Sequence, residues 1–361
     1  MTEAEKLKEL RERIDAVDER LIDLISERAR CAEEVAKIKR ADGANNDLYR
    51  PEREAQILRR VQEGNPGPLS GETLARLFRE IMSACLALEA RLKIAFLGPA
   101  GTYTHASVLK HFGRDVGLAP MSSLSEVFRE VEAGSCQYGV VPIENSTEGV
   151  VSHTLDLFVQ SPLKVCGEVL MRIHHNLLSQ HEQLGDIKRV YAHQQALAQC
   201  RRWLDVNLPQ AERVALSSNA EAARRAAADT GTAAIAGDTA AELYGLNILQ
   251  RNIEDHPDNT TRFLVIGTQT VPPSGDDKTT VLVSTANRPG ALHRLLTPLA
   301  LNNVSMTRIE SRPSRCVNWE YVYFLDIEGH AEDPKVKAAL AGLRQEAELF
   351  RILGAYPRAV L

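Results

Sequence analysis

The sequence predicts a multidomain protein in which an all-α part, an α/β part and a small α+β part follow one another. Its length of 361 residues exceeds that of a typical single domain. Apolar residues at heptad spacing open the chain, and from Lys93 strand patterns alternate with helix patterns up to Gly267. After the turn-rich segment 272–277, which we predict to be a linker, the pattern changes to βαββαβ.

The composition is that of an ordinary soluble globular protein, with 44% hydrophobic and 25% charged residues. A formal net charge of -5 argues against nucleic acid or a membrane surface as a partner. Residues 1–13 are highly charged, which argues against a secretory signal, and no apolar run is long enough to cross a bilayer. We therefore expect a cytoplasmic protein.

The cysteines are scattered and form no CxxC pair, so neither a disulfide framework nor a zinc site is expected. We interpret them as reduced thiols; they are Cys31, Cys85, Cys136, Cys166, Cys200 and Cys316.

Three helices are predicted in the first part. The heptad of apolar residues predicts one long helix that reaches about Arg40. Two further amphipathic helices are predicted over Arg53–Glu63 and Glu72–Arg91, separated by the breaker run Gly64–Pro68.

Arg28 occupies a heptad position where an apolar residue is expected, and a buried guanidinium needs an anion. Lys39 lies about 16 Å further along the same helix on nearly the same face, so both cations can converge on one ligand. Arg11 lies about 25 Å before Arg28 on a different face and can reach that ligand only from a second chain. We therefore predict an intertwined dimer. The alternative is that Arg28 pairs with Glu27 or Glu33 on a solvated coiled coil.

Polar loops flank two predicted strands of the α/β part. The apolar strand that ends at Ile143 is followed by the polar run Glu144–Glu148, and the run Asp255–Arg262 precedes the strand Phe263–Gly267. Ligands of open α/β sheets bind beyond the carboxyl ends of strands, so the two loops predict a cleft. The alternatives are a capped helix start for the first loop and a β-branched strand entry for the second.

The last part is predicted to form a small sheet with two helices. A glycine at its first strand-to-helix turn, Gly290, allows helix-start amides to receive an amino-acid carboxylate. The predicted elements are strand Thr279–Thr285, helix Ala291–Leu301, strands Val304–Ser311 and Glu320–Ile327, helix Pro334–Gln345 and strand Leu349–Leu353.

Residues 1–91 resemble the all-helical chorismate mutases through Leu10–Asp15, Glu27–Arg28, Lys37–Lys39, Pro51–Glu54 and Ile81–Glu89. The resemblance implies that Arg28 and the partner subunit's Arg11 bind the two carboxylates of chorismate, and that Lys39 donates to the ether oxygen. It also implies that Arg53 and Glu54 hold the ring hydroxyl and the pocket. Two further predicted contacts depart from the family pattern, with Arg50 where aspartate is frequent and Cys85 where serine is frequent.

Glu89 stands where the mutases carry glutamine or glutamate. An ionised carboxylate beside the ether oxygen would repel the charge that develops there, so we expect Glu89 to act as the neutral acid. Mutase activity should then fall as pH rises, and Glu89→Gln should flatten this profile.

Residues 93–268 resemble prephenate dehydratase through Gly98–His105, Pro142–Ser146, His175–Leu177, Ala192–Cys200 and Asn259–Phe263. The resemblance implies two α/β lobes like those of periplasmic binding proteins, with prephenate between them and Thr261 as the essential residue at the departing hydroxyl. We expect neutral donors to hold the carboxylates. The predicted prephenate contacts are Thr102, Glu144, Asn145, Ser146, His193, Gln195, Thr261 and Arg262.

No cofactor and no metal are expected. The run Gly98–Gly101 lacks the Lys-Ser/Thr of a P-loop and the three-glycine spacing of a dinucleotide-binding loop. This absence counts against a fusion of mutase with a nicotinamide-dependent prephenate dehydrogenase.

Residues 278–357 resemble the ACT regulatory domain through Asn287–Leu292 and Ile309–Pro313. The resemblance implies feedback inhibition by phenylalanine bound between paired domains. The predicted effector contacts are Gly290, Ala291, Leu292, Glu310, Ser311 and Arg312. The alternative is a packing domain that only dimerises.

Together these resemblances predict a bifunctional enzyme of phenylalanine biosynthesis that converts chorismate to prephenate and prephenate to phenylpyruvate. Its partners would be these small molecules and a second copy of the chain, as a homodimer or higher oligomer. One alternative is an arogenate dehydratase with mutase activity. Another is a non-catalytic regulator that responds to an amino acid, although such a sensor has no use for two reactive pockets.

Overall fold

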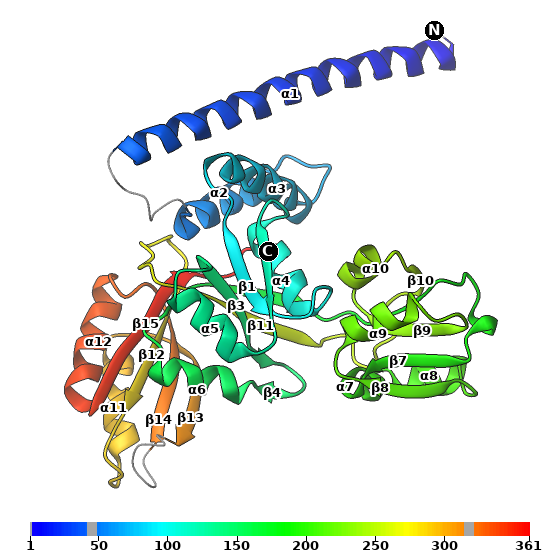
Figure 1. The fold of residues 1–361 in the computed structure, drawn as a ribbon. Helices are drawn as coiled ribbons and strands as arrows, with labels where there is room; N and C mark the ends of the chain where they lie inside the picture. The colour runs from blue at the N-terminus through cyan, green and yellow to red at the C-terminus, as the bar shows by residue number, and fades with distance from the viewer. Residues whose placement is uncertain (1, 42–48, 314–320) are drawn as a thin grey trace.

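The computed structural model describes residues 2–41, 49–313 and 321–361 and arranges them as three domains (Figure 1). The first domain consists of α1 (Glu3–Ala41), α2 (Pro51–Glu63) and α3 (Gly71–Glu89), which confirms the three predicted helices. Pro51 suits the first turn of α2, where no intrahelical bond needs its missing N–H. Ser70 caps α3 by accepting a hydrogen bond from the Thr73 N–H at 3.1 Å.

Helix α1 extends well beyond α2 and α3 (Figure 1). Near its end Ala36 is buried, but the apolar stripe along the rest of the helix faces solvent in the single chain. Leu10 and Leu21, for example, are 51% and 50% exposed. Contiguous apolar surface of this kind marks an interaction site.

The second domain has two lobes, as expected. The first lobe is a sheet of order β2-β1-β3-β11-β5, in which β1, β2 and β3 are parallel and β11 runs antiparallel to both of its neighbours. Its strands are β1 (Lys93–Leu97), β2 (Gly117–Met121), β3 (Tyr138–Asn145), β4 (Gly149–Val150), β5 (Lys164–Arg172) and β11 (Thr260–Gly267), with helices α4 (Tyr103–Phe112), α5 (Leu124–Glu132) and α6 (Ser152–Gln160).

The second lobe is a sheet of order β10-β6-β9-β7-β8. The chain crosses between the lobes twice, and the crossings are joined by a 2.8 Å bond from the Ile173 N–H to the Asn259 carbonyl. The elements of this lobe are β6 (Asn176–Ser179), η1 (Leu184–Asp186), β7 (Arg189–His193), α7 (Gln194–Gln199), α8 (Arg201–Asn207), β8 (Glu212–Leu216), α9 (Asn219–Ala226), β9 (Thr232–Ala236), α10 (Asp238–Tyr244) and β10 (Asn247–Gln250).

The third domain is the predicted βαββαβ unit, a sheet of order β13-β14-β12-β15 with two helices. Leu282, Phe324 and Leu353 of this sheet share one apolar cluster with Val141 and Leu264 of the first lobe. The elements are β12 (Asp277–Ser284), α11 (Ala291–Leu301), β13 (Met306–Pro313), β14 (Tyr321–Glu328), α12 (Pro334–Glu346) and β15 (Leu349–Pro357). Glu320, predicted to begin a strand, and Cys316 lie outside the described residues.

Segment 272–277 is a packed joint rather than a free linker. Ser274 and Asp277 are each only 5% exposed, and the Ser274 hydroxyl donates to Asp277 Oδ1 at 2.6 Å. Arg59 of α2 donates to the Ser274 carbonyl at 3.2 Å. The turn residues of this segment therefore form part of the contact between the first and third domains.

Candidate active sites

A cleft of about 860 Å³ lies between the two lobes. The first lobe contributes Thr102, Asn145 and Thr261, and the second contributes His193 and Gln195. These five residues were predicted to meet here, and the structure brings them together.

The Thr261 hydroxyl is oriented by Asn145. Asn145 Oδ1 accepts hydrogen bonds from the backbone N–H groups of Thr147 and Glu148, both at 3.0 Å. Because backbone N–H groups only donate, the other end of this side chain must be its NH₂ group, which donates to Thr261 Oγ1 at 2.8 Å. Thr261 is thus an acceptor toward Asn145, and its own hydrogen remains available to another group in the cleft.

Hydrogen bonds between side-chain amides extend from Asn145 along the cleft wall. Asn145 Nδ2 also donates to Asn259 Oδ1 at 2.7 Å, and Asn259 Nδ2 donates to Gln199 Oε1 at 3.2 Å. Gln199 Oε1 lies 2.8 Å from His175 Nε2. Sequence reasoning missed Gln199 and Asn259 as site residues, although both lie within the motifs that carry the resemblance to prephenate dehydratase.

His175 is held by two partners, Gln199 at Nε2 and the Tyr103 hydroxyl, 2.7 Å from Nδ1. Burial lowers its pKa, which favours the neutral ring. Both ring nitrogens are engaged, so the geometry assigns His175 a structural role in the cleft wall.

Thr102 and His193 begin the helices that border the cleft. Thr102 Oγ1 accepts from the His105 N–H at 3.3 Å at the start of α4. His193 Nδ1 accepts from the Gln195 N–H at 3.4 Å at the start of α7. This contact positions the imidazole beside Gln195, whose side chain has the neutral amide that the sequence predicts for a carboxylate-binding cleft.

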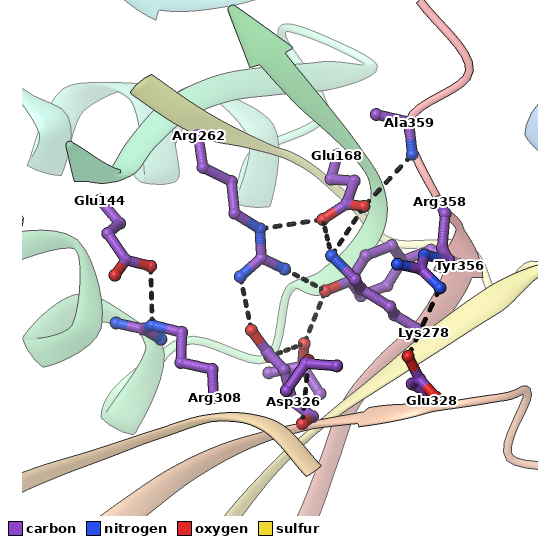
Figure 2. A network of polar contacts seen from close by, with 12 residues as sticks. Glu144, Glu168, Arg262, Lys278, Arg308, Asp326, Glu328, Tyr356, Arg358 and Ala359 are labelled. Atoms are coloured by element: carbon purple, nitrogen blue, oxygen red, sulfur yellow. Dashed lines mark hydrogen bonds and ion pairs between the residues drawn. The ribbon is translucent and has the colours of Figure 1, made fainter. Parts of the chain in front are cut away.

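Glu144 and Arg262 lie on the opposite side of the sheet from the cleft, which corrects their predicted position. Residues alternate between the faces of a strand, and β3 and β11 pair Asn145 with Thr261 and Glu144 with Arg262. The first pair lines the cleft. Glu144 instead forms a 3.0 Å ion pair with Arg308 of the third domain (Figure 2).

Arg262 lies in a buried polar network with the third domain (Figure 2). Its Nε donates to Glu168 Oε2 at 2.9 Å, and its terminal nitrogens donate to Asp326 Oδ2 at 2.5 Å and to the Tyr356 hydroxyl at 3.0 Å. Lys278 Nζ donates to the same Glu168 carboxylate. Arg262 therefore joins the first lobe to the third domain.

Ser146 also differs from its predicted position. Its hydroxyl accepts from the Thr260 N–H at 2.9 Å and is 3.3 Å from the Asp258 carbonyl oxygen. It is not among the residues that line the cleft. Ser146 instead joins the two polar loops predicted to form the cleft walls.

A second pocket, of about 160 Å³, lies among the three helices of the first domain. The predicted residues that line it are Arg28, Arg50, Arg53, Glu54, Cys85 and Glu89. Lys39 is not among its lining residues, and Arg11 lies on the exposed part of α1.

Glu54 is the buried carboxylate of this helical pocket, and it pairs with Arg79 of α3. Burial raises the pKa of Glu54, whereas Arg79, Arg28 and a hydrogen bond from Tyr49 oppose that shift. Sequence reasoning missed Arg79. Its spacing from the buried Ala75 and Met82 places a cation on the apolar face of α3, the same signal that identified Arg28.

A third pocket, of about 200 Å³, lies at the start of α11. Gly290, Ala291 and Leu292 line it with Tyr321 and Tyr323 of β14. Gly290 has φ 74°, a left-handed conformation that favours glycine.

The other predicted effector residues, Glu310, Ser311 and Arg312, lie on β13 and do not line this C-terminal pocket in the single chain. Arg312 donates to Asp156 Oδ1 at 3.1 Å and to the Ser152 hydroxyl at 2.9 Å, both on α6. It therefore contacts the first lobe.

Within the described residues, no group of three or more His, Cys, Asp or Glu side chains is arranged to hold a metal ion. None of the helices described combines the length and apolar character needed to cross a membrane.

The structure thus has a two-lobed domain with a hydroxyl-bearing cleft, a helical domain with a cationic pocket and a third domain with its own small pocket. This arrangement is typical of a multidomain enzyme. Family models support each part. Chorismate mutase type II matches residues 10–90, prephenate dehydratase matches residues 94–271, and the ACT domain matches residues 279–345.

Two curated relatives match the full length of this chain and are themselves covered completely. The bifunctional chorismate mutase/prephenate dehydratases of Stutzerimonas stutzeri and Pseudomonas aeruginosa are 56% and 55% identical to it. Among solved structures, prephenate dehydratase from Arthrobacter aurescens in complex with L-Phe has a TM-score of 0.69 and 38% identity, over 74% of this chain and 90% of that one.

The chain belongs to the family of bifunctional chorismate mutase/prephenate dehydratases. It is an enzyme of phenylalanine biosynthesis that rearranges chorismate to prephenate and converts prephenate to phenylpyruvate. The predictions of family, fold class and activity are confirmed, and neither arogenate dehydration nor a non-catalytic regulator is favoured.

Proposed function

We propose that Thr261 donates a hydrogen bond to the ring hydroxyl of prephenate as that hydroxyl departs. In this step the bond from the ring to the carboxylate breaks and releases carbon dioxide. Its electron pair enters the ring, and the carbon–oxygen bond to the hydroxyl breaks. The hydroxide that leaves takes up a proton to become water. Aromatisation drives the step, so the enzyme needs chiefly to assist the poorer leaving group.

The observation that carries this proposal is the orientation of the Thr261 hydroxyl. Asn145 donates to its oxygen, which leaves its hydrogen available in the cleft. An available hydroxyl hydrogen can stabilise negative charge on a leaving oxygen. Thr102, His193 and Gln195 also line the cleft and are the proposed contacts to the rest of prephenate. We assign Asn145 the positioning of Thr261, because both ends of its amide are already engaged.

The dehydratase proposal is tested by replacing the hydroxyl. Thr261→Ser keeps the donor and should retain dehydratase activity. Thr261→Val keeps the shape and should lower kcat by about 100-fold or more, as loss of a donor to developing charge does elsewhere. Mutase activity of the same preparations is the control for folding. An active Val variant would disprove the role of the hydroxyl.

For the mutase reaction, we propose that Arg28, Arg53 and Glu54 bind chorismate in the helical pocket. The rearrangement breaks the ether carbon–oxygen bond and forms a carbon–carbon bond, so no nucleophile is needed. The pocket would hold the compact conformer and stabilise charge on the ether oxygen. We assign Lys39 and Glu89 to that oxygen, and Arg50 and Cys85 to the pocket wall.

We further propose that two chains form an intertwined dimer in which Arg11 of the partner subunit completes each mutase pocket. The support is the apolar stripe of α1, exposed in the single chain from Leu7 to Leu24. A helix with such a stripe is stabilised by covering it with a complementary surface. In a symmetric pair both chains give and receive the same residues, so two pockets would be completed together.

Phenylalanine is the proposed effector. The pocket at Gly290, Ala291 and Leu292 supports this, as does the similar prephenate dehydratase whose structure is a complex with L-Phe. Glu310, Ser311 and Arg312 are proposed to act where third domains pair. Calorimetry with phenylalanine tests this assignment, and absence of binding at millimolar concentration would contradict it. The proposed domain boundaries are 1–91 for the mutase, 93–268 for the dehydratase and 278–357 for the regulatory domain.

A further inference from the structure

Tyr49 contacts both the helical mutase domain and the dehydratase domain. It lines the mutase pocket together with Glu54, yet its ring packs into the core of the dehydratase domain. The ring centroid lies 5.2 Å from that of Phe112 and 5.3 Å from that of Tyr138, and the side chain is only 3% exposed. One wall of the mutase pocket is thus supported by the dehydratase domain.

His111 of α4 is the polar partner of this tyrosine. Its Nε2 lies 2.9 Å from the Tyr49 hydroxyl. Burial, with a contribution from the Arg79 guanidinium, lowers the pKa of His111 to about 3, so the ring is neutral. Space for the ring depends on Gly167 of β5, where a Cβ atom would lie 3.2 Å from His111 Cε1.

The Tyr49 hydroxyl also acts on Glu54, which lines the same pocket, and it opposes the rise in the pKa of that carboxyl. A hydroxyl lowers the pKa of a carboxyl when its hydrogen points toward the carboxylate, so the Tyr49 hydrogen is directed toward Glu54. The Tyr49 oxygen must then accept from His111, whose neutral ring therefore carries its hydrogen on Nε2. The resulting series runs from His111 through Tyr49 to Glu54.

We infer that His111, a residue of the dehydratase domain, is a positioning residue for the mutase reaction and acts through Tyr49 on Glu54. This inference rests on the proposed role of Glu54 in binding the ring hydroxyl of chorismate. The charges of Arg79 from α3 and Arg28 from α1 lower the pKa of Glu54, and the charged side chains of Arg50, Arg53 and Glu89 line the same pocket. Fusion of the two enzymes therefore places part of the mutase site's support in the neighbouring domain.

The test uses Tyr49→Phe and two substitutions of His111 in the full-length protein. His111→Leu removes the donor, whereas His111→Gln places an amide N–H near the position of Nε2. Tyr49→Phe and His111→Leu should each lower mutase kcat/KM by about tenfold, the effect expected for one hydrogen bond to a charged group. His111→Gln should stay within about threefold of the parent. Dehydratase activity should be unchanged in all three and serves as the folding control.

A pH profile distinguishes positioning from a purely structural role. Burial raises the pKa of Glu54, and the Tyr49 hydroxyl opposes this shift. Removal of that hydroxyl should therefore raise the pKa of Glu54 further. Mutase activity, lost at low pH as Glu54 takes up a proton, should then be lost at a higher pH in Tyr49→Phe. The double variant Tyr49→Phe/His111→Leu should be no worse than Tyr49→Phe, because the two residues act in series.

Parental mutase kinetics and an unmoved pH profile in Tyr49→Phe and His111→Leu would overturn the inference. So would a His111→Gln variant as impaired as His111→Leu. Glu54→Gln separates this failure from failure of the pocket assignment. If Glu54→Gln impairs the mutase while the other variants do not, only the inference about His111 fails; if Glu54→Gln is also without effect, the assigned role of Glu54 is wrong.

Discussion

The dehydratase cleft and the mutase pocket of this chain differ in how they are built. The cleft receives Thr261 and Asn145 from one lobe and Gln195 from the other, so a single chain supplies opposing walls. The mutase pocket lies beside α1, whose apolar stripe is exposed, and the predicted Arg11 is absent from its lining. A site between lobes depends on the fold of its own chain, whereas the mutase site, as we propose it, depends on assembly.

The largest expected effect comes from a charge on the exposed stripe of α1. Leu21→Asp places a carboxylate where the stripe would meet a partner, so pairing and delivery of the partner subunit's Arg11 should both fail. We expect mutase kcat/KM to fall by about 100-fold, the value of a strong charge-assisted contact to a substrate carboxylate. Dehydratase activity should stay within about twofold.

Val206 provides a matched control because it is an apolar residue, 78% exposed, on α8 of the second lobe. Val206→Asp should leave both activities unchanged, as surface substitutions away from special features do. Equal loss of both activities in Leu21→Asp would indicate general misfolding and contradict the proposed difference between the sites.

Asn145→Asp should give the next largest effect, this time in the cleft. An aspartate keeps the acceptor for Thr147 and Glu148 but loses the NH₂ group that fixes the Thr261 hydroxyl. The hydroxyl should then donate to the new carboxylate instead of the leaving group. We expect dehydratase kcat to fall by about 30-fold with mutase activity unchanged. A parental kcat would show that Asn145 does not orient Thr261.

The smallest effect on activity is expected for Arg262→Met, since the guanidinium points away from the cleft. Dehydratase KM should change by less than about threefold. Stability should fall by about 3 kcal/mol, because the buried Asp326 carboxylate loses its ion pair. Thermal and urea unfolding measure this change.

Glu144→Gln is the comparison for Arg262→Met. The ion pair between Glu144 and Arg308 is more exposed to solvent than that of Arg262, because the Glu144 side chain is 38% exposed. The loss of stability in Glu144→Gln should therefore be about 1 kcal/mol or less. A large rise in KM for prephenate in either variant would restore the original prediction that these residues contact substrate.

Much of the fold follows from periodicity alone. The heptad and the breaker at Gly64–Pro68 predicted three helices, and α11 has the predicted bounds Ala291–Leu301. The packed joint at 272–277 could not be predicted from periodicity. Ser274 and Asp277 are residues that favour turns, and their burial results from contacts with each other and with Arg59, which the sequence does not show.

The residues of the cleft were harder to predict where two consecutive residues of a strand lie on opposite faces of the sheet. The sequence placed Glu144 and Asn145, and likewise Arg262 and Thr261, in one cleft. The period of two along a strand would have separated each pair, but which member faces the cleft depends on the packing of the third domain against the sheet. Tyr49 could not be found from local pattern, because its role depends on contacts with a different domain.

Mixing two impaired chains tests most directly whether the mutase site is shared between subunits. Arg11→Ala and Arg28→Ala should each lower mutase kcat/KM by about 100-fold. In a mixed dimer one pocket receives an intact Arg28 and the partner subunit's intact Arg11, while the other pocket lacks both. Random pairing after co-expression should therefore restore about one quarter of parental mutase activity. Dehydratase activity should be unaffected throughout. Absence of recovery in mixtures shown to contain mixed dimers would contradict a shared site.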